Sequence, residues 1–324
     1  MQTPLLVIGL GIFLLLTTIS CQSPADLADM KKAFQKGECQ NCHPAIWREW
    51  KRSLHAKSWS DPIYQKMVEG FPNRRQTCDP CHAPQPILIT GLGQMPKLRQ
   101  LNRDSGVSCL TCHVDVNGSM HGPKGSRPAN FHSDVVNSGY SQNATQLCAT
   151  CHGQPSVSAH QQIRDWQIQE QKNKNCTSCH MPANNRLQST QSSKPMRGRK
   201  HTWEGSHSRS MLKRSAKLTI SRTKTNVVVT IENKTGHYLP GDGLRTIILE
   251  VSFGSKTQQY FFSANISPNG LDLESDDRLA FNHSKQFNFS VPKNQSVMVR
   301  LFYQLLPHQP KTDWVLIAKT EAKP

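Results

Sequence analysis

Residues 38–59 read ECQNCHPAIWREWKRSLHAKSW. Two cysteines, Cys39 and Cys42, stand three positions apart, and His43 follows directly. This C-x-x-C-H pattern is the attachment signature of c-type haem, in which both thiols bond to the haem and the adjacent histidine ligates its iron. A second histidine, His55, follows twelve residues later and is a candidate for the opposite side of an iron.

The same pattern occurs five times in 324 residues and uses ten of the 11 cysteines. Zinc sites, disulfides and thiol redox pairs do not require a histidine after every second cysteine. The sequence therefore predicts five covalently attached haem c groups, each with one iron. The predicted attachment residues are Cys39, Cys42, Cys78, Cys81, Cys109, Cys112, Cys148, Cys151, Cys176 and Cys179, and the predicted iron ligands beside them are His43, His82, His113, His152 and His180.

The remaining cysteine, Cys21, follows an apolar, uncharged run at residues 4–20. The run is slightly short for a bilayer span and is typical of a signal-peptide core. A small residue, Ser20, before Cys21 indicates a bacterial lipoprotein signal over residues 1–21, with Cys21 as the lipidated N-terminus and membrane anchor. We expect an exported protein, periplasmic or at the outer membrane or cell surface, and Gln22 favours the outer membrane.

Basic residues exceed acidic ones, with 39 Lys and Arg against 22 Asp and Glu and a formal charge of +17. Such a charge would suggest nucleic acid or an anionic surface, but the propionates of five haems offset much of it. We therefore expect no nucleic-acid partner. The densest basic segment, residues 194–224, could hold propionates or dock an acidic redox partner.

The chain divides into the signal at residues 1–21, a haem domain at residues 22–210 and a second domain at residues 215–320. The haem domain is polar and is expected to be mostly helical or irregular, with porphyrin supplying most of its buried apolar surface. One exception is "AIWREWKRSLHAKSW", where Ile46, Trp50 and Leu54 at i+4 spacing predict a short amphipathic helix.

From about residue 215 the apolar residues alternate with period two. In "RTIILEVSF", Ile247, Leu249 and Val251 share a face and Glu250 lies opposite. About seven such runs predict an all-β antiparallel sandwich. The fold class is thus mixed, with a haem-packed domain followed by a β domain that contains no cysteine and serves docking, assembly or capping of a haem.

Nine histidines lie outside the motifs and compete for the second iron positions. A haem with two histidine ligands is closed and suits electron transfer, whereas an open position permits substrate chemistry. Nine candidates allow two histidines on every iron without proving it. They are His55, His121, His132, His160, His201, His207, His237, His283 and His308.

Three passages carry a resemblance to a known family. They are "CHPAIWREWKRSLHAKSW", "CTSCHMP" followed by "RKHTWEGSHSRSMLKRSAKLTI", and "TGHYLPGDGLRTIILEV". The chain resembles multihaem cytochromes c related to the tetrahaem electron acceptor of hydroxylamine oxidoreductase, in a form with a C-terminal β domain. This sequence has Trp203-Glu204 and Ser206 where the family usually has Phe and Gly.

The resemblance implies that His55, His201 and His207 are second iron ligands. His121, eight residues beyond His113, fits the family's habit of a histidine shortly after the third motif. For the fifth place His160 and His132 compete, and His160 is included among the predicted ligands. His237 begins a turn between two strands, which is either structural or able to reach a haem, and His283 and His308 are interpreted as surface residues.

These observations predict an electron carrier rather than an enzyme, passing electrons between five haems and unidentified donor and acceptor proteins. The first rival is a multihaem reductase or oxidase of a small nitrogen or sulfur compound at a five-coordinate haem. The second is a homo-oligomer or extracellular haem filament in which the β domain mediates assembly.

Overall fold

The computed structural model describes residues 24, 26–71, 73–123, 131–137, 139–142, 144–154, 161–168, 175–267 and 272–324. Cys21 and His160 therefore lie outside the described residues. Among the described residues, no helix combines the length and the hydropathy needed to span a bilayer.

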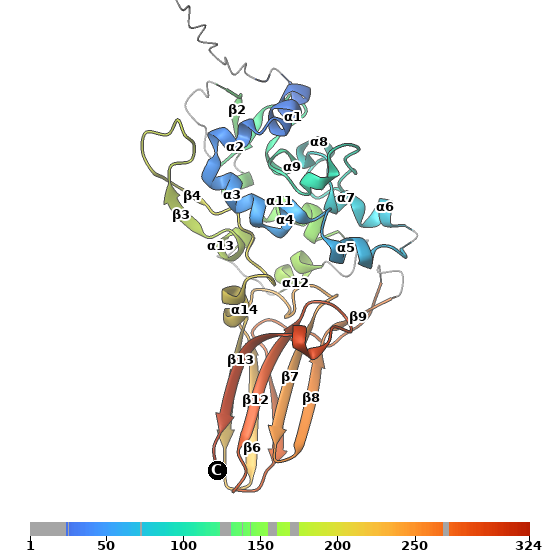
Figure 1. Ribbon diagram of the computed structural model, residues 1–324, viewed down its shortest axis with the longest axis vertical. Helices are drawn as coiled ribbons and strands as arrows, with labels where there is room; N and C mark the ends of the chain where they lie inside the picture. The colour runs from blue at the N-terminus through green and yellow to red at the C-terminus, as the bar shows by residue number, and fades with distance from the viewer. Residues whose placement is uncertain are drawn as a thin grey trace, which may run out of the picture.

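Short helices build the part of the chain that carries the five motifs (Figure 1). They are separated by turns and by two small ladders, one parallel and one antiparallel. The helices are α1 (Leu27–Gln35), α2 (Glu38–Cys42), α3 (Pro44–Arg52), α4 (Leu54–Lys57), α5 (Pro62–Met67), α6 (Arg74–Thr77), α7 (Asp79–His82), α8 (Ile87–Thr90), η1 (Arg103–Ser105), α9 (Cys109–His113), α10 (Gly139–Gln142), α11 (Ala144–His152), α12 (Gln162–Ile168), α13 (Cys176–His180) and α14 (Arg209–Ser215), and the ladders pair β1 (Met120–Gly122) with β2 (Asp134–Val136) and β3 (Ala183–Arg186) with β4 (Met196–Arg199).

The rest of the chain folds into two antiparallel sheets, in strand orders β11-β6-β5 and β13-β12-β7-β8. All seven runs predicted as strands lie in these sheets. A short ladder of β9 (Ala264–Ile266) and β10 (Leu273–Asp276) and the turn η3 (Lys311–Asp313) complete this part. The long strands are β5 (Ala216–Arg222), β6 (Asn226–Asn233), β7 (Thr246–Phe253), β8 (Lys256–Phe262), β11 (Ser284–Ser290), β12 (Val297–Gln304) and β13 (Val315–Ala322).

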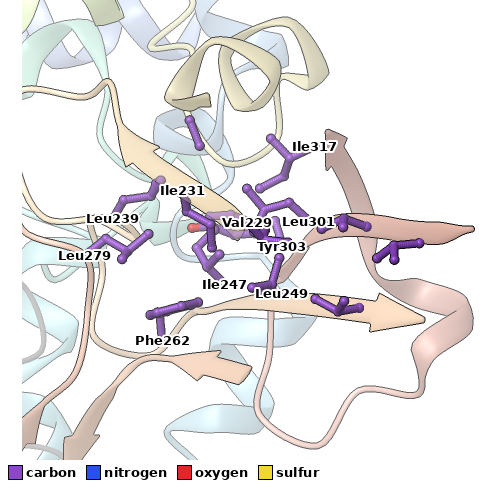
Figure 2. Packing of buried hydrophobic residues seen from close by; sticks show 14 of the residues in the cluster. Val229, Ile231, Leu239, Ile247, Leu249, Phe262, Leu279, Leu301, Tyr303 and Ile317 are labelled. Carbon is purple, nitrogen blue, oxygen red and sulfur yellow. The ribbon is translucent and has the colours of Figure 1, made fainter. Parts of the chain in front are cut away.

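The alternating apolar residues of both sheets pack into one core (Figure 2). Ile247, Leu249 and Val251 of β7 are fully buried there, as the alternation predicted. Glu250, on the opposite face of β7, is also buried, because Arg300 of β12 and Lys311 of η3 pair with its carboxylate. The outer face of this sheet is therefore covered locally by the η3 turn, which alternation alone does not predict.

The motif-bearing part has a much smaller core of its own side chains. Among the described residues it is a cluster of six buried residues around Trp50, whereas the β core contains eighteen. Both α12 and α14 lie where the helical part meets the strands (Figure 1). Such a thin core agrees with a domain that depends on bound groups for its apolar interior.

The helix predicted over Ile46, Trp50 and Leu54 breaks at Ser53. Ser53 is extended, and its hydroxyl accepts from the Ala56 amide at 3.3 Å, so it ends α3 and caps α4. Trp50 is buried as expected, but Leu54 is 40% exposed. The break redirects the chain immediately before His55.

Candidate haem-binding sites

Each of the five motifs lies on a short helix or at its end: α2, α7, α9, α11 and α13. Helical residues three apart share a face, so the two thiols of a motif point to the same side. A capping box at Ser108 and Thr111 begins α9, and another at Asn175 and Ser178 begins α13. None of the ten motif cysteines forms a disulfide.

Four of the five motif histidines are oriented by hydrogen bonds from their Nδ1 atoms to backbone carbonyls. His43 donates to Gln188 at 2.8 Å and His82 donates to Ser58 at 2.7 Å. Because a carbonyl oxygen only accepts, Nδ1 carries the proton and Nε2 keeps its lone pair for a metal. His113 and His180 make the same contact with the carbonyls of His121 and Glu204 at 2.7 and 2.5 Å.

Four motif histidines face the ring of a second histidine from elsewhere in the chain. The separations between ring centroids are nearly identical, although the angles between ring planes range from 13° to 55°. The pairs are His43 with His132 (6.3 Å), His55 with His152 (6.2 Å), His113 with His201 (6.2 Å) and His180 with His237 (6.3 Å).

This separation fits one iron between two imidazoles. A ligating histidine nitrogen lies about 2 Å from its metal, and the ring centre lies roughly 1 Å further out, so two rings on one ion stand roughly 6 Å apart. Direct ring stacking would bring the rings closer, as for Tyr64 on His82 at 3.6 Å. The residues at these four sites therefore fit haem iron held from both sides.

Burial keeps three of the facing histidines, His55, His201 and His237, in the neutral form that binds metal. Together with the nearby His152, it lowers the pKa of His55 to about 3. Burial and the nearby His113 lower the pKa of His201 to about 3, and burial lowers the pKa of His237 to about 4. All three are neutral at physiological pH.

Two of the histidines predicted as second ligands, His55 and His201, stand opposite motif histidines. His121 makes different contacts: its Nε2 lies 2.9 Å from Asp115, and its carbonyl, rather than its ring, meets His113. His207 is exposed, with Glu204 and Lys57 as charged neighbours. His160 lies outside the described residues, so its assignment stays a prediction.

The structure instead brings His132 and His237 to motif histidines. His132 follows a sequence with no helical pattern, and its Nδ1 lies 2.6 Å from Asp134. His237 comes from the loop between β6 and β7, at the end of the β domain that meets the helices (Figure 1). The only sequence signal for His237 was the "TGHYLPGDG" passage, which allowed either a structural turn or a loop that reaches a haem.

The loop that presents His237 is closely fitted. The Nδ1 atom of His237 donates to the Tyr238 carbonyl at 2.7 Å, and the Asn233 side chain donates to the His237 carbonyl at 2.8 Å. A Cβ at Gly241 would stand 2.6 Å from Cε1 of His237, so only glycine fits there without displacing the ring.

A buried ion pair joins this loop to the helical part. Arg278, whose side chain is 2% exposed, lies 3.1 Å from Asp165 of α12 and 2.7 Å from Asp276. The same guanidinium packs over the Tyr238 ring, next to His237. Asp165 also pairs with Arg164 at 3.2 Å, so the junction contains a small network of charges rather than a single pair. Arg278 thus contacts both α12 of the helical part and the loop that carries His237.

A family model described as "Cytochrome c554 and c-prime" matches residues 38–114. The chain also matches the crystal structure of a penta-haem cytochrome c552 from Thermochromatium tepidum, with a TM-score of 0.62, 20% identity, and coverage of 89% of this chain and 98% of that one. The chain therefore has the fold of a multihaem cytochrome c.

Weaker likenesses cover a third of the chain. One is a family 56 carbohydrate-binding module that binds β-1,3-glucan (TM-score 0.18, 7% identity, 33% of this chain and 98% of that one). Another is the chicken interferon gamma receptor alpha chain (TM-score 0.19, 10% identity, 33% and 48%). A comparison with curated proteins finds no significant match.

Replacing His237 by Ala tests the contribution of the β domain to a haem site. We expect the haem to stay attached, because the cysteines and His180 are untouched, while one haem in five changes from low to high spin. Electron paramagnetic resonance of the oxidised protein measures this. His308→Ala, an exposed histidine of the same domain, is the matched control and should leave the spectrum unchanged. An unaltered spectrum in His237→Ala would contradict the assignment.

Proposed function

We propose that this chain is an exported electron-transfer protein that carries five haem c groups. The observation that carries the proposal is the set of four facing histidine pairs, each at the separation that one iron requires. The family match and the shared fold support it. When bound, haem c supplies reversible one-electron exchange between Fe(III) and Fe(II).

The protein's own residues favour a carrier over an enzyme at these four sites. An imidazole on each side of an iron leaves a small molecule no open position on that iron. A reductase or oxidase would instead need an open position with groups that donate protons or stabilise charge. The four paired sites therefore do not support a reductase or oxidase function.

Contacts between motifs indicate the order of the sites. Cys176 lies near enough to Cys148 to raise its pKa, and Cys81 lies near enough to Cys151 to do the same. Cys112 is near enough to both Cys148 and Cys151 to raise the pKa of each. The fourth motif thus adjoins the second, third and fifth.

The first and third motifs are also neighbours. Burial and the nearby Cys39 thiol raise the pKa of Cys109 to about 12, and His43 is close enough to His113 to lower its pKa. We propose a path from the first to the third and fourth sites, with the second and fifth as branches. The fifth site faces the β domain.

Export and lipid attachment at Cys21 remain predictions of the sequence. Recovery of the mature protein with an unmodified N-terminus from the soluble fraction would refute the lipid anchor.

The haem content and the carrier role are tested together on the mature protein. We expect intact mass and haemochrome absorbance to agree on five haems per chain. Stepwise reduction under anaerobic conditions should take up five electrons, and at least four of the irons should be low-spin in the oxidised state. Four haems or fewer would contradict the haem count. Rapid turnover of nitrite or hydroxylamine would favour the reductase.

We also propose that the β3–β4 hairpin docks an acidic redox partner beside the first site. Residues 183–203 contain no Asp or Glu, and Lys194, Arg197 and Lys200 are exposed. Leu187 and Met196 add exposed apolar surface, at 48% and 45%. The hairpin touches the first motif through Gln188, which accepts from His43, and through Thr190, whose amide donates to the Cys42 carbonyl at 2.8 Å.

Charge reversal tests this docking surface. The double variant Lys194→Glu and Arg197→Glu should slow reduction by an acidic donor such as reduced flavodoxin about tenfold at low salt, because complementary charges govern the encounter rate. The rates should converge as salt rises. Lys319→Glu with Lys323→Glu, an equal charge change at the far end of the β domain, is the control. Equal rates in both double variants would contradict the assignment.

A further inference from the structure

Trp203 contacts the second histidines of two different sites. Its ring centroid lies 4.7 Å from that of His55, at 72°, and 5.3 Å from that of His201, at 86°. His55 faces His152, and His201 faces His113. A single indole thus joins the site of the third motif to the site of the fourth.

The contact with His55 coincides with a missing hydrogen bond. The Nδ1 atoms of His201 and His237 have backbone acceptors, the carbonyls of Arg199 at 3.0 Å and Tyr238 at 2.7 Å. Nδ1 of His55 is buried and has no hydrogen-bond partner among the described residues. A near-perpendicular arrangement is the one in which the edge of one ring meets the face of another. Trp203 is thus an aromatic neighbour of a ring that has no hydrogen bond from Nδ1 to orient it.

The backbone at Trp203 supports a positional role. Its φ is +42°, in the left-handed region that bulky residues rarely adopt. Such strain persists where the surroundings hold both sides of the residue. Here the His201 amide donates to Glu49 at 2.8 Å, and the Glu204 carbonyl accepts from His180. The segment 201–204 thereby reaches three haem sites within four residues.

We infer that Trp203 is a positioning residue for two haem sites: its indole fixes the ring orientations of His55 and His201 and so sets the ligand geometry at both irons. The inference rests on the proposed haem binding. The planes of the two rings are 55° apart in the pair of His55 and 38° apart in the pair of His201. These angles influence the magnetic anisotropy and the reduction potential of a low-spin iron, as ligand orientation generally does.

The test uses electron paramagnetic resonance and potentiometric titration of the oxidised, haem-loaded protein. His55→Ala and His201→Ala first assign the two low-spin signals, since each variant should lose its own. In Trp203→Leu we then expect these two signals and their potentials to shift together, while the signals of the pairs formed by His132 and His237 stay in place. Trp203→Phe keeps a smaller ring face and should shift the same two signals less.

Trp314→Leu is the matched control, because Trp314 packs on Phe302 in the β domain, away from the motifs. It should leave all signals unchanged. Unaltered signals in both Trp203 variants, or an equal shift of every signal, would overturn the inference. If Trp203→Leu yields no haem-loaded protein, the shift of the two signals in Trp203→Phe alone tests the inference. Failure of the proposed function is distinguishable, because the wild type would then show no low-spin signals at all.

Discussion

The constraint on which this structure depends is the gap between facing imidazole rings. Four pairs from different parts of the chain stand 6.2–6.3 Å apart, although their ring angles differ widely. A shared distance with variable angles is expected when the bond lengths to one metal fix the separation and local packing fixes the rotation. Backbone carbonyls that accept from Nδ1 hold most of the rings in place. Short helices and irregular loops suffice for this, because each has only to place one ring.

The β domain takes part in this arrangement. It has a large core of its own, yet its β6–β7 loop presents His237 to His180 of the fifth motif. Arg278 and Asp165 close the same junction with a buried ion pair. Under the proposed function, the fifth haem would therefore need both parts of the chain, and its binding energy would contribute to their association. A domain without a single cysteine can in this way determine the properties of a haem site.

The sequence predicted the elements with a local signature. The five motifs are recognised from the spacing of their cysteines and histidines alone, and the strands follow the alternation of apolar residues such as Ile247 and Leu249. The facing histidines were harder to predict because the pairing is tertiary. The spacing of His121 after His113 suggested a ligand, but the chain turns so that the His121 carbonyl reaches His113. His132 has no local pattern and His237 lies in a turn motif that does not identify its partner, and only the folded chain brings them to His43 and His180. The helix break at Ser53, which redirects His55, is likewise set by a single hydroxyl cap.

Anomalous diffraction at the iron absorption edge from crystals of the haem-loaded protein tests the central claim most directly. The account predicts that four iron peaks lie between the ring pairs His43 and His132, His55 and His152, His113 and His201, and His180 and His237, each about 2 Å from the Nε2 atoms of both rings. Iron peaks displaced from these gaps, or irons ligated on one side only at these four sites, would contradict it.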